Sequence, residues 1–293
     1  MLTAVGFIGL GLMGQGMTKC LVREGYRVTG FDINPTMNDL ATEHGVSIVP
    51  HARAVAEVSE IILICVMTPS DLEAAIFGES GIAHGISPQT VLVDHSTTPV
   101  DVTKFMATRL KEASGAGWVD APVSGGTEGA EAGTLAIMAG GTDIDIIKIK
   151  TVMETLASNF TVFGDVGSGQ VAKMVNQVLV LNNYAIIAEA LALAEAGGID
   201  VAKIPEALAT GHAGSNLLPV LFPRMANRDF EPRGRARQIL KDFDSLHEFA
   251  KTLKTPTPMS AQATSLFRML IARGSGELDG TSILKLYEQN ATN

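Results

Sequence analysis

The first half of the chain alternates short β-branched runs with amphipathic stretches. Apolar runs bounded by Gly, Pro, Asn or Asp predict strands, and the stretches between them place apolar residues at helical spacing. This alternation is typical of a parallel sheet with helices on both faces. The predicted strands are residues 4–8, 27–31, 61–67, 91–93, 118–119, 135–138 and 160–163, and the predicted helices include 13–24, 35–44 and 99–112.

The strand pattern stops after about Gly164. Residues 169–196 form one long helical pattern without proline, and Gly197 and Gly198 follow it as a C-cap. We therefore predict an α/β domain with a mostly parallel sheet over residues 1–163, and an all-α domain built around one long helix over residues 164–293. The further helices are predicted at 201–210, 215–226, 236–253, 258–273 and 282–289.

Composition excludes several classes of protein. With 46% hydrophobic and 18% charged residues, the chain has the apolar side chains for a core, which a disordered chain lacks. A net charge of −9 argues against a nucleic-acid partner, because binding the phosphate backbone of a nucleic acid needs a clustered positive surface. Cys20 and Cys65 are isolated, with no zinc-like spacing, which predicts buried thiols in a reducing compartment and no metal site.

The sequence predicts neither a secretory signal peptide nor a membrane-spanning helix. The N-terminal residues have no charged region before the first apolar run, so they do not resemble a signal peptide. The apolar stretch 178–194 is interrupted by Asn182, Asn183 and Glu189, which favours a buried core helix over a membrane span. We expect a soluble, cytoplasmic protein.

A glycine-rich motif lies between the first predicted strand and helix. Its residues are Gly9, Leu10, Gly11, Leu12, Met13 and Gly14, which fit G-x-G-x-x-G. In this motif the first glycine makes the tight turn, the second lets the backbone approach a pyrophosphate, and the third lets helix and strand pack closely. The phosphates then lie at a helix N-terminus, which favours anions. Strand, motif and helix together predict a Rossmann dinucleotide-binding domain.

Asp32 ends the second predicted strand, 18 residues after Gly14. A carboxylate there accepts hydrogen bonds from ribose hydroxyls and repels a 2′-phosphate, so NAD is favoured over NADP as cofactor, although NADP stays open. Capping of the next helix is the alternative role for Asp32, and the two roles can coexist.

Two later loops are expected to face the cofactor. Ligands of open α/β sheets bind beyond the carboxyl ends of the strands, where both loops lie. The first contains Met67, Thr68 and Pro69, and the second contains Thr97. Helix capping explains residues 96–98 equally well.

Residues that could act on a substrate follow the fifth predicted strand, residues 118–119, and open the long helix. The turn 120–126 offers a hydroxyl and backbone N–H groups, which can hold a carboxylate without arginine. Lys173 and Asn176 share one face of the long helix, and apolar residues lie on the side of Lys173. A partly buried ammonium can exchange a proton near neutrality, whereas an ordinary surface or helix-terminal lysine does not. Both readings of Lys173 stay open on the residues alone.

The motifs together resemble the β-hydroxyacid dehydrogenases, the group of 3-hydroxyisobutyrate dehydrogenase and tartronate semialdehyde reductase. The matching segments are 6–14, 120–126 continuing through 133–135, 169–176 and 241–243, and they span almost the whole chain in the family's order. The resemblance implies two domains, with dimers or tetramers formed through the helical half. It also implies an NAD(P)-dependent oxidoreductase that interconverts a small 3-hydroxy acid and its semialdehyde by hydride transfer.

The resemblance assigns roles to individual residues. Lys173 would be the general acid and base at the carbonyl oxygen, and Asn176 would orient the substrate. The loop Ser124, Gly125 and Gly126 would bind the substrate carboxylate. Lys241 would lie near the active site, and Thr97 beside the nicotinamide ribose.

The substrate is less well defined. Residues 131–135, 176–177 and 188–191 look more like tartronate semialdehyde reductases than isobutyrate enzymes, so tartronate semialdehyde and glycerate are the preferred pair. The alternatives are 3-hydroxyisobutyrate and another β-hydroxy acid, of the threonate or hydroxymethylglutarate type, that carries a second anionic group. The chain departs from its relatives in Arg233, Arg235 and Arg237, before Lys241.

One of these arginines, Arg237 in our assignment, could hold a second anionic group, since a guanidinium binds a carboxylate in bidentate fashion. A solvated helix start or a subunit contact explains the same residues. An imine reductase is disfavoured because those enzymes typically lack the lysine, and a phosphogluconate-type enzyme would need a longer helical domain. A non-catalytic dinucleotide-binding relative remains as an alternative from another class.

Overall fold

The computed structural model describes residues 3–288. The chain divides into two compact units, Met1–Lys173 and Met174–Asn293, and each has its own hydrophobic core. By its internal contacts the first unit extends to Lys173, inside the long helix and ten residues beyond the predicted end of the α/β domain at residue 163. The reason is local, because the first turn of that helix is bonded to the sheet of the first unit.

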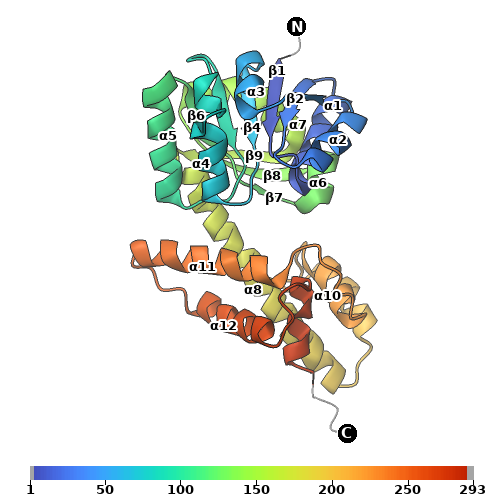
Figure 1. The fold of residues 1–293 in the computed structure, drawn as a ribbon. Coiled ribbons are helices and arrows are strands. Elements are labelled where there is room, and N and C mark those ends of the chain that lie inside the picture. The colour runs from blue at the N-terminus through green and yellow to red at the C-terminus, as the bar shows by residue number, and fades with distance from the viewer. Residues whose placement is uncertain (1–2, 289–293) are drawn as a thin grey trace. The chain divides into compact units, whose positions relative to one another are not determined.

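The first unit is built on one mostly parallel sheet (Figure 1). Among the described residues the strand order is β3-β2-β1-β4-β5-β6-β8-β7, and β9 pairs with β8. Along the sheet from β3 through β2, β1, β4 and β5 to β6, neighbouring strands are parallel. Strand β8 is antiparallel to β6 and β7, and β9 is parallel to β8. The strands are β1 Ala4–Ile8, β2 Arg27–Phe31, β3 Ser47–Ile48, β4 Ile61–Ile64, β5 Val91–Asp94, β6 Gly117–Asp120, β7 Val123–Ser124, β8 Leu135–Gly140 and β9 Ala157–Gly164.

Helices cover both faces of this sheet, so its central strands are buried on both sides (Figure 1). In β4, Ile61 and Leu63 join one core, while Ile62 and Ile64 join the other. The first face is covered by α1 Leu12–Arg23, α2 Pro35–Glu43, α6 Gly126–Ala132 and α7 Asp143–Leu156. The second is covered by α3 Ala52–Val58, α4 Pro69–Phe77, α5 Val100–Ser114 and the 3₁₀ turn η1 Ile82–His84.

The second unit is helical, and most of α8, Ser168–Ala196, belongs to it. By length and composition alone α8 could cross a membrane. Its Leu181, Ala188 and Leu191 are nevertheless buried among the fully buried rings of Phe243 and Phe267, as predicted for a core helix. The other elements are η2 Val201–Lys203, α9 Ile204–Leu208, α10 Leu218–Ala226, α11 Ala236–Thr252, α12 Pro258–Ala272 and η3 Gly280–Leu286.

The predicted fold class is confirmed, and the differences concern short elements. The predicted strand 61–67 ends at Ile64, and the predicted helix 201–210 divides into η2 and α9. The predicted helix 282–289 is the 3₁₀ segment η3, and its last residue lies outside the described residues. The sequence pattern did not predict β3 and β7, which are two residues long, because two residues are too few to show alternation. Neither thiol is paired; Cys20 is buried, as predicted, and Cys65 is half-buried.

Candidate active site

The turn between β1 and α1 has the shape of a phosphate cradle. Gly9 has φ of +86°, and a side chain there would collide with the carbonyl oxygen of Cys65. A side chain at Gly14 would collide with the carbonyl of Gly9, so helix and strand can approach only with glycine at this position. Gly11 faces open space, and no side chain caps the N-terminus of α1. The N–H groups of that first turn are thus available to an anion such as a pyrophosphate.

Asp32 orders this turn from the end of β2. Its Oδ2 accepts a hydrogen bond from the backbone N–H of Leu10 at 2.7 Å, and its Oδ1 accepts one from Asn34 at 2.7 Å. Asn34, and not Asp32, caps α2, so the alternative role given to Asp32 is filled by its neighbour. Leu10 buries its side chain in the core, while Leu12 is exposed and Met13 half-buried at the start of α1.

The loop after β4 is also a helix start. Thr68 caps α4 by accepting a hydrogen bond from the N–H of Asp71, whose carboxylate bonds back to the Thr68 N–H. Pro69 occupies the first turn of α4, and the Met67 side chain is 64% exposed. Hydrogen bonds of the helix cap therefore order the predicted cofactor loop, with Met67 at its surface.

The loop after β5 holds its hydroxyl groups inward. Ser96 accepts a hydrogen bond from the backbone N–H of Val66 at 3.0 Å, and the Thr98 and Thr103 hydroxyls lie 2.7 Å apart. The residue before α5 is Pro99, and no side chain caps that helix. Capping therefore does not explain Ser96 and Thr98; Thr97 between them is half-buried.

Two buried ionisable groups lie where β5 ends. Burial raises the pKa of Asp94 to about 7, against the hydrogen bond that its Oδ1 accepts from the Ser96 N–H at 2.9 Å. Burial also lowers the pKa of His95 to about 4, and the ring Nδ1 lies 2.7 Å from the carbonyl oxygen of Ala121. Asp94 is therefore mainly uncharged below about pH 7, and His95 is mainly uncharged above about pH 4.

The first turn of α8 is bonded to the carboxyl ends of β5 and β6. Asp120 Oδ1 accepts from the N–H of Gly167 at 2.6 Å, and its Oδ2 accepts from the N–H of Gln170 at 2.9 Å. The Gln170 amide donates to the carbonyl oxygen of Ser96 at 2.8 Å. Asp120 and Gln170 are fully buried, and burial raises the pKa of Asp120 while the backbone N–H bonds oppose it. This contact fixes where the next turn of α8 begins.

That next turn carries Lys173, which the structure buries. Its side chain is 8% exposed, and Nζ donates to the carbonyl oxygen of Val123 at 2.8 Å. The reading of Lys173 as an ordinary surface lysine is therefore wrong. Val123 and Ser124 form β7, and Gly125 and Gly126 follow with φ of +134° and +66°. The structure thus brings the predicted proton donor to the predicted carboxylate loop.

Asn176 lies one turn further along α8, within the second unit, and is half-buried. Its Nδ2 donates to Gln177 Oε1 at 3.0 Å, and Gln177 Nε2 donates to Asp242 Oδ2 at 2.7 Å. Lys241, beside Asp242 on α11, is exposed. The sequence pattern gives no role to Asp120, Gln170, Gln177 or Asp242. The sequence signal that could have identified such residues is a polar side chain at the end of an apolar strand, as for Asp120, or within an apolar helix face, as for Gln177.

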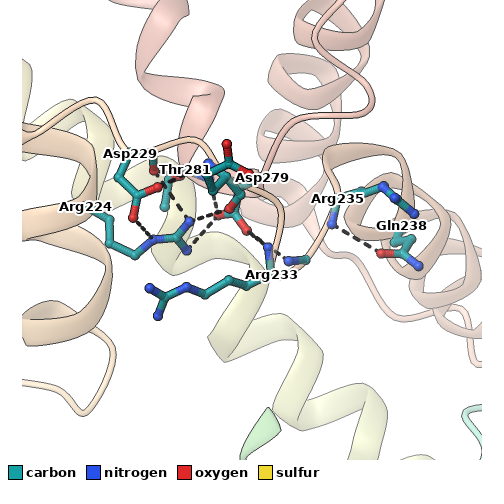
Figure 2. Close-up of polar contacts among 9 residues, drawn as sticks. Arg224, Asp229, Arg233, Arg235, Gln238, Asp279 and Thr281 are labelled. Atoms are coloured by element: carbon teal, nitrogen blue, oxygen red, sulfur yellow. Dashed lines mark hydrogen bonds and ion pairs between the residues drawn. The ribbon is translucent and has the colours of Figure 1, made fainter. Parts of the chain in front are cut away.

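Arg224, the first residue of the basic segment 224–241, forms a buried ion pair with Asp279 (Figure 2). The Arg224 guanidinium lies 3.1 Å from Asp279 and 3.0 Å from Asp229, and the Asp279 side chain is 1% exposed. Asp279 also accepts hydrogen bonds from the backbone N–H groups of Arg233 and Gly234, at 2.8 and 2.9 Å (Figure 2). Arg224 and Asp279 thus hold the segment that leads into α11.

Two further arginines of this segment, Arg235 and Arg237, lie near one carboxylate. Arg235 Nε lies 3.4 Å from Glu277 and Arg237 Nε lies 2.8 Å from the same side chain. All three side chains are substantially exposed. Two positive charges against one negative charge leave this surface positive.

No cluster of His, Cys, Asp or Glu within residues 3–288 could hold a metal ion. The glycine cradle, by contrast, fits a dinucleotide, because a Cβ at Gly11 would project into the open space that a bound phosphate needs.

Comparison with known proteins covers nearly the whole chain. Residues 4–164 match the family model for the NAD-binding domain of 6-phosphogluconate dehydrogenase, and residues 167–287 match that for the NAD-binding domain of NADP-dependent 3-hydroxyisobutyrate dehydrogenase. The 2-hydroxy-3-oxopropionate reductase of Escherichia coli is 36% identical over 97% of each chain. The 2-(hydroxymethyl)glutarate dehydrogenase of Eubacterium barkeri is 32% identical over 97% of this chain and 95% of its own. The crystal structure of 3-hydroxyisobutyrate dehydrogenase from Salmonella typhimurium superposes with a TM-score of 0.87 at 28% identity, covering 97% of this chain and 99% of its own.

Proposed function

Because the chain belongs to the β-hydroxyacid dehydrogenase family, a group of oxidoreductases that act on CH–OH with a nicotinamide dinucleotide, we propose that it interconverts glycerate and tartronate semialdehyde with NAD. The observation that carries this proposal is the buried Lys173 ammonium, bonded to the carbonyl oxygen of Val123 beside the loop 124–126. A buried cation next to backbone donors suits a small anionic substrate whose oxygen gains or loses a proton.

Lys173 handles the proton. When bound, the nicotinamide supplies or accepts the hydride. In the direction of reduction, the Lys173 ammonium donates a proton to the carbonyl oxygen of the semialdehyde, and in oxidation the neutral amine removes it from the hydroxyl. The bond to Val123 uses one of the three N–H donors of the ammonium and fixes the position of Nζ.

The loop 124–126 holds the carboxylate of the substrate. Ser124 offers a hydroxyl, and Gly125 and Gly126, both with positive φ, lead into α6, whose N-terminal N–H groups no side chain caps. A side chain at Gly126 would enter open space, so the loop has room for a ligand. Asn176 orients the substrate from the following turn of α8.

Asp32 sets the preference for NAD. The N–H groups of Leu10 and Asn34 hold its carboxylate in place, and each oxygen keeps a further lone pair for a ribose hydroxyl. A 2′-phosphate at this position would meet the negative charge of Asp32. We assign the adenine-side ribose to Asp32, the nicotinamide side to the loops with Met67, Thr68, Pro69 and Thr97, and a cofactor-binding role to Lys241.

A second candidate substrate carries two anionic groups. Arg235 and Arg237 share the single carboxylate of Glu277, so an incoming carboxylate can exchange with Glu277 at Arg237. The relative that acts on 2-(hydroxymethyl)glutarate, by its name, is consistent with this alternative.

We also propose that the protein is cytoplasmic and forms a homodimer or homotetramer through its helical unit. Leu179, Ile186 and Leu193 on α8 are 64%, 56% and 75% exposed. They are seven residues apart, which places them along one side of a helix. A second copy of the chain would remove this apolar stripe from water, and Ile186→Asp should shift the mass measured by light scattering toward the monomer.

Steady-state kinetics test the proposed function. Oxidation of NADH and NADPH would be followed with tartronate semialdehyde, methylmalonate semialdehyde, succinate semialdehyde and glyoxylate, and the reverse reaction with glycerate, 3-hydroxyisobutyrate, threonate and 2-(hydroxymethyl)glutarate. The highest kcat/KM with tartronate semialdehyde and NADH supports the proposal. Preference for 2-(hydroxymethyl)glutarate would move the assignment to the second candidate. Tight NADH binding without turnover of any compound would refute both and favour a non-catalytic role.

A further inference from the structure

Gln177 is a buried amide whose two ends are both bonded. Its side chain lies on α8, and the residue is 5% exposed. Gln177 Nε2 donates to Asp242 Oδ2 at 2.7 Å, and Gln177 Oε1 accepts from Asn176 Nδ2 at 3.0 Å. Asp242, Gln177 and Asn176 thus form a continuous chain of hydrogen bonds within the second unit.

The direction of these hydrogen bonds follows from their chemistry. An ionised carboxylate only accepts, so Asp242 requires the NH₂ end of Gln177. The oxygen of Gln177 must then face Asn176, which in turn requires the NH₂ end of Asn176. Because the oxygen and nitrogen of an amide lie on opposite sides, Asn176 Oδ1 faces away from Gln177. One carboxylate therefore selects the orientation of two successive amides.

The packing of α11 holds the carboxylate in place. Phe243, the residue after Asp242, is fully buried, and its ring centroid lies 5.8 Å from that of Phe267. Ile239, one turn earlier, is also buried in the same core. A side chain on so well anchored a helix turn fixes a neighbour more precisely than one on a loop.

We propose that Asp242 and Gln177 are positioning residues that turn the carbonyl oxygen of Asn176 toward the substrate, where it accepts a hydrogen bond from the 2-hydroxyl of the acid. This inference rests on the proposed function, which places Asn176 at the substrate. It names the substrate class more closely: 3-hydroxy acids that carry a second hydroxyl, such as glycerate, over those without one, such as 3-hydroxypropionate. A site built to bond a hydroxyl rejects the analogue that lacks it, because a polar group of the protein is then left unpaired.

Selectivity between these two acids is the kinetic test. Gln177→Met removes the amide at similar side-chain length, and Asp242→Asn removes the charge that selects the orientation. Each variant should lower the ratio of kcat/KM for glycerate to that for 3-hydroxypropionate by roughly 3- to 10-fold, the effect of one neutral hydrogen bond. The double variant should lower it no further than Gln177→Met alone, because both changes interrupt one chain of bonds.

The matched control is Asp244→Asn. Asp244 lies on the same helix α11, and its exposed carboxylate bonds Arg268 at 2.7 Å, outside the chain of amides. This variant should keep the wild-type ratio, and all variants should keep the wild-type Kd for NAD. An unchanged ratio in both Gln177→Met and Asp242→Asn overturns the proposal.

Side-chain amide resonances separate this inference from the proposed function. In ¹H–¹⁵N spectra, Asp242→Asn should shift the side-chain amide signals of both Gln177 and Asn176, Gln177→Met should shift that of Asn176, and Asp244→Asn should shift neither. If Asp242→Asn moves only the Gln177 signal, the orientation is not passed on and the proposal fails. If the wild-type protein oxidises neither acid, the proposed function and the selectivity both fail, while the spectra still decide whether Asp242 orients Asn176.

Discussion

Asp279 allows a quantitative test of what holds the start of α11. Its side chain is 1% exposed and accepts hydrogen bonds from the Arg224 guanidinium and from the backbone N–H groups of Arg233, Gly234 and Thr281. Replacing Asp279 with alanine removes every one of these acceptors and leaves the Arg224 side chain, 10% exposed, without its most buried partner. Breaking a buried ion pair in this way costs about 3–5 kcal/mol.

The low end of that range is expected here. Arg224 keeps Asp229 Oδ2 at 3.0 Å and the carbonyl oxygen of Glu231 at 2.7 Å, so its charge is not left alone. We therefore expect Asp279→Ala to lower the free energy of unfolding by about 3 kcal/mol. Arg224→Met combined with Asp279→Ala should cost less than the two single changes added together, because no buried charge then remains unpaired.

Urea unfolding followed by far-ultraviolet circular dichroism measures this loss, since the second unit is helical. The control is Glu248→Ala, which removes a carboxylate that is 77% exposed and 3.9 Å from Lys251, and it should cause no measurable change. The fluorescence of Trp118, the single tryptophan of the chain, follows the first unit and should shift less than the dichroism. A loss below about 1 kcal/mol for Asp279→Ala, as for an exposed ion pair, would refute the reasoning.

Three further results are expected. Lys173→Ala should lower kcat by roughly 10²- to 10⁴-fold while the Kd for NAD, measured by titration calorimetry, stays near the wild-type value; retained turnover would remove Lys173 from the chemistry. Asp32→Asn should raise the kcat/KM ratio of NADPH to NADH by roughly ten-fold, because close like charges in water repel by about 1 kcal/mol per charge, and an unchanged ratio contradicts the role of Asp32. Since burial raises the pKa of Asp94 to about 7, the folded protein holds a proton that the unfolded chain releases, and the stability from this group is lost as the pH rises from about 4 through about 7. Denaturant titrations should therefore show a steeper fall in stability over that range for the wild type than for Asp94→Asn, and parallel curves would exclude Asp94 as the cause.

Features set by short stretches of sequence were predictable. The glycine cradle depends on turns within residues 9–14 and on Asp32 at the end of the adjacent strand, so spacing alone identified it. The long helix was equally clear, because its apolar pattern continues without proline from residue 169 to 196. The short helix α6 was not predicted, since its sequence of Gly, Thr, Glu and Ala has no apolar face.

Features that join distant residues were not predictable from one sequence. From the sequence alone, Lys173 could be a surface residue or a buried one. Its position depends on the start of α8, where Gln170 is bonded to Asp120, 50 residues away. The basic segment before α11 read as a solvated or ligand-binding cluster, yet Arg224 pairs with Asp279, 55 residues away, and is buried. No local pattern of hydrophobic and polar positions contains such partners, because periodicity reports only which face of an element is covered.

Two carboxylates, the fully buried Asp120 and the half-buried Asp242, share one physical task. Asp120 accepts N–H groups at the start of α8 and so fixes the helix turn that carries Lys173, while Asp242 accepts the amide of Gln177 and so fixes Asn176. A buried acceptor costs desolvation, which is recovered only when the donors stand in the correct place, and it therefore penalises every other arrangement of those donors. Carboxylates that need not contact the substrate therefore fix the positions of Lys173 and Asn176, the residues that we assign to substrate. For this reason we expect changes at such carboxylates to alter turnover and selectivity before they alter cofactor binding.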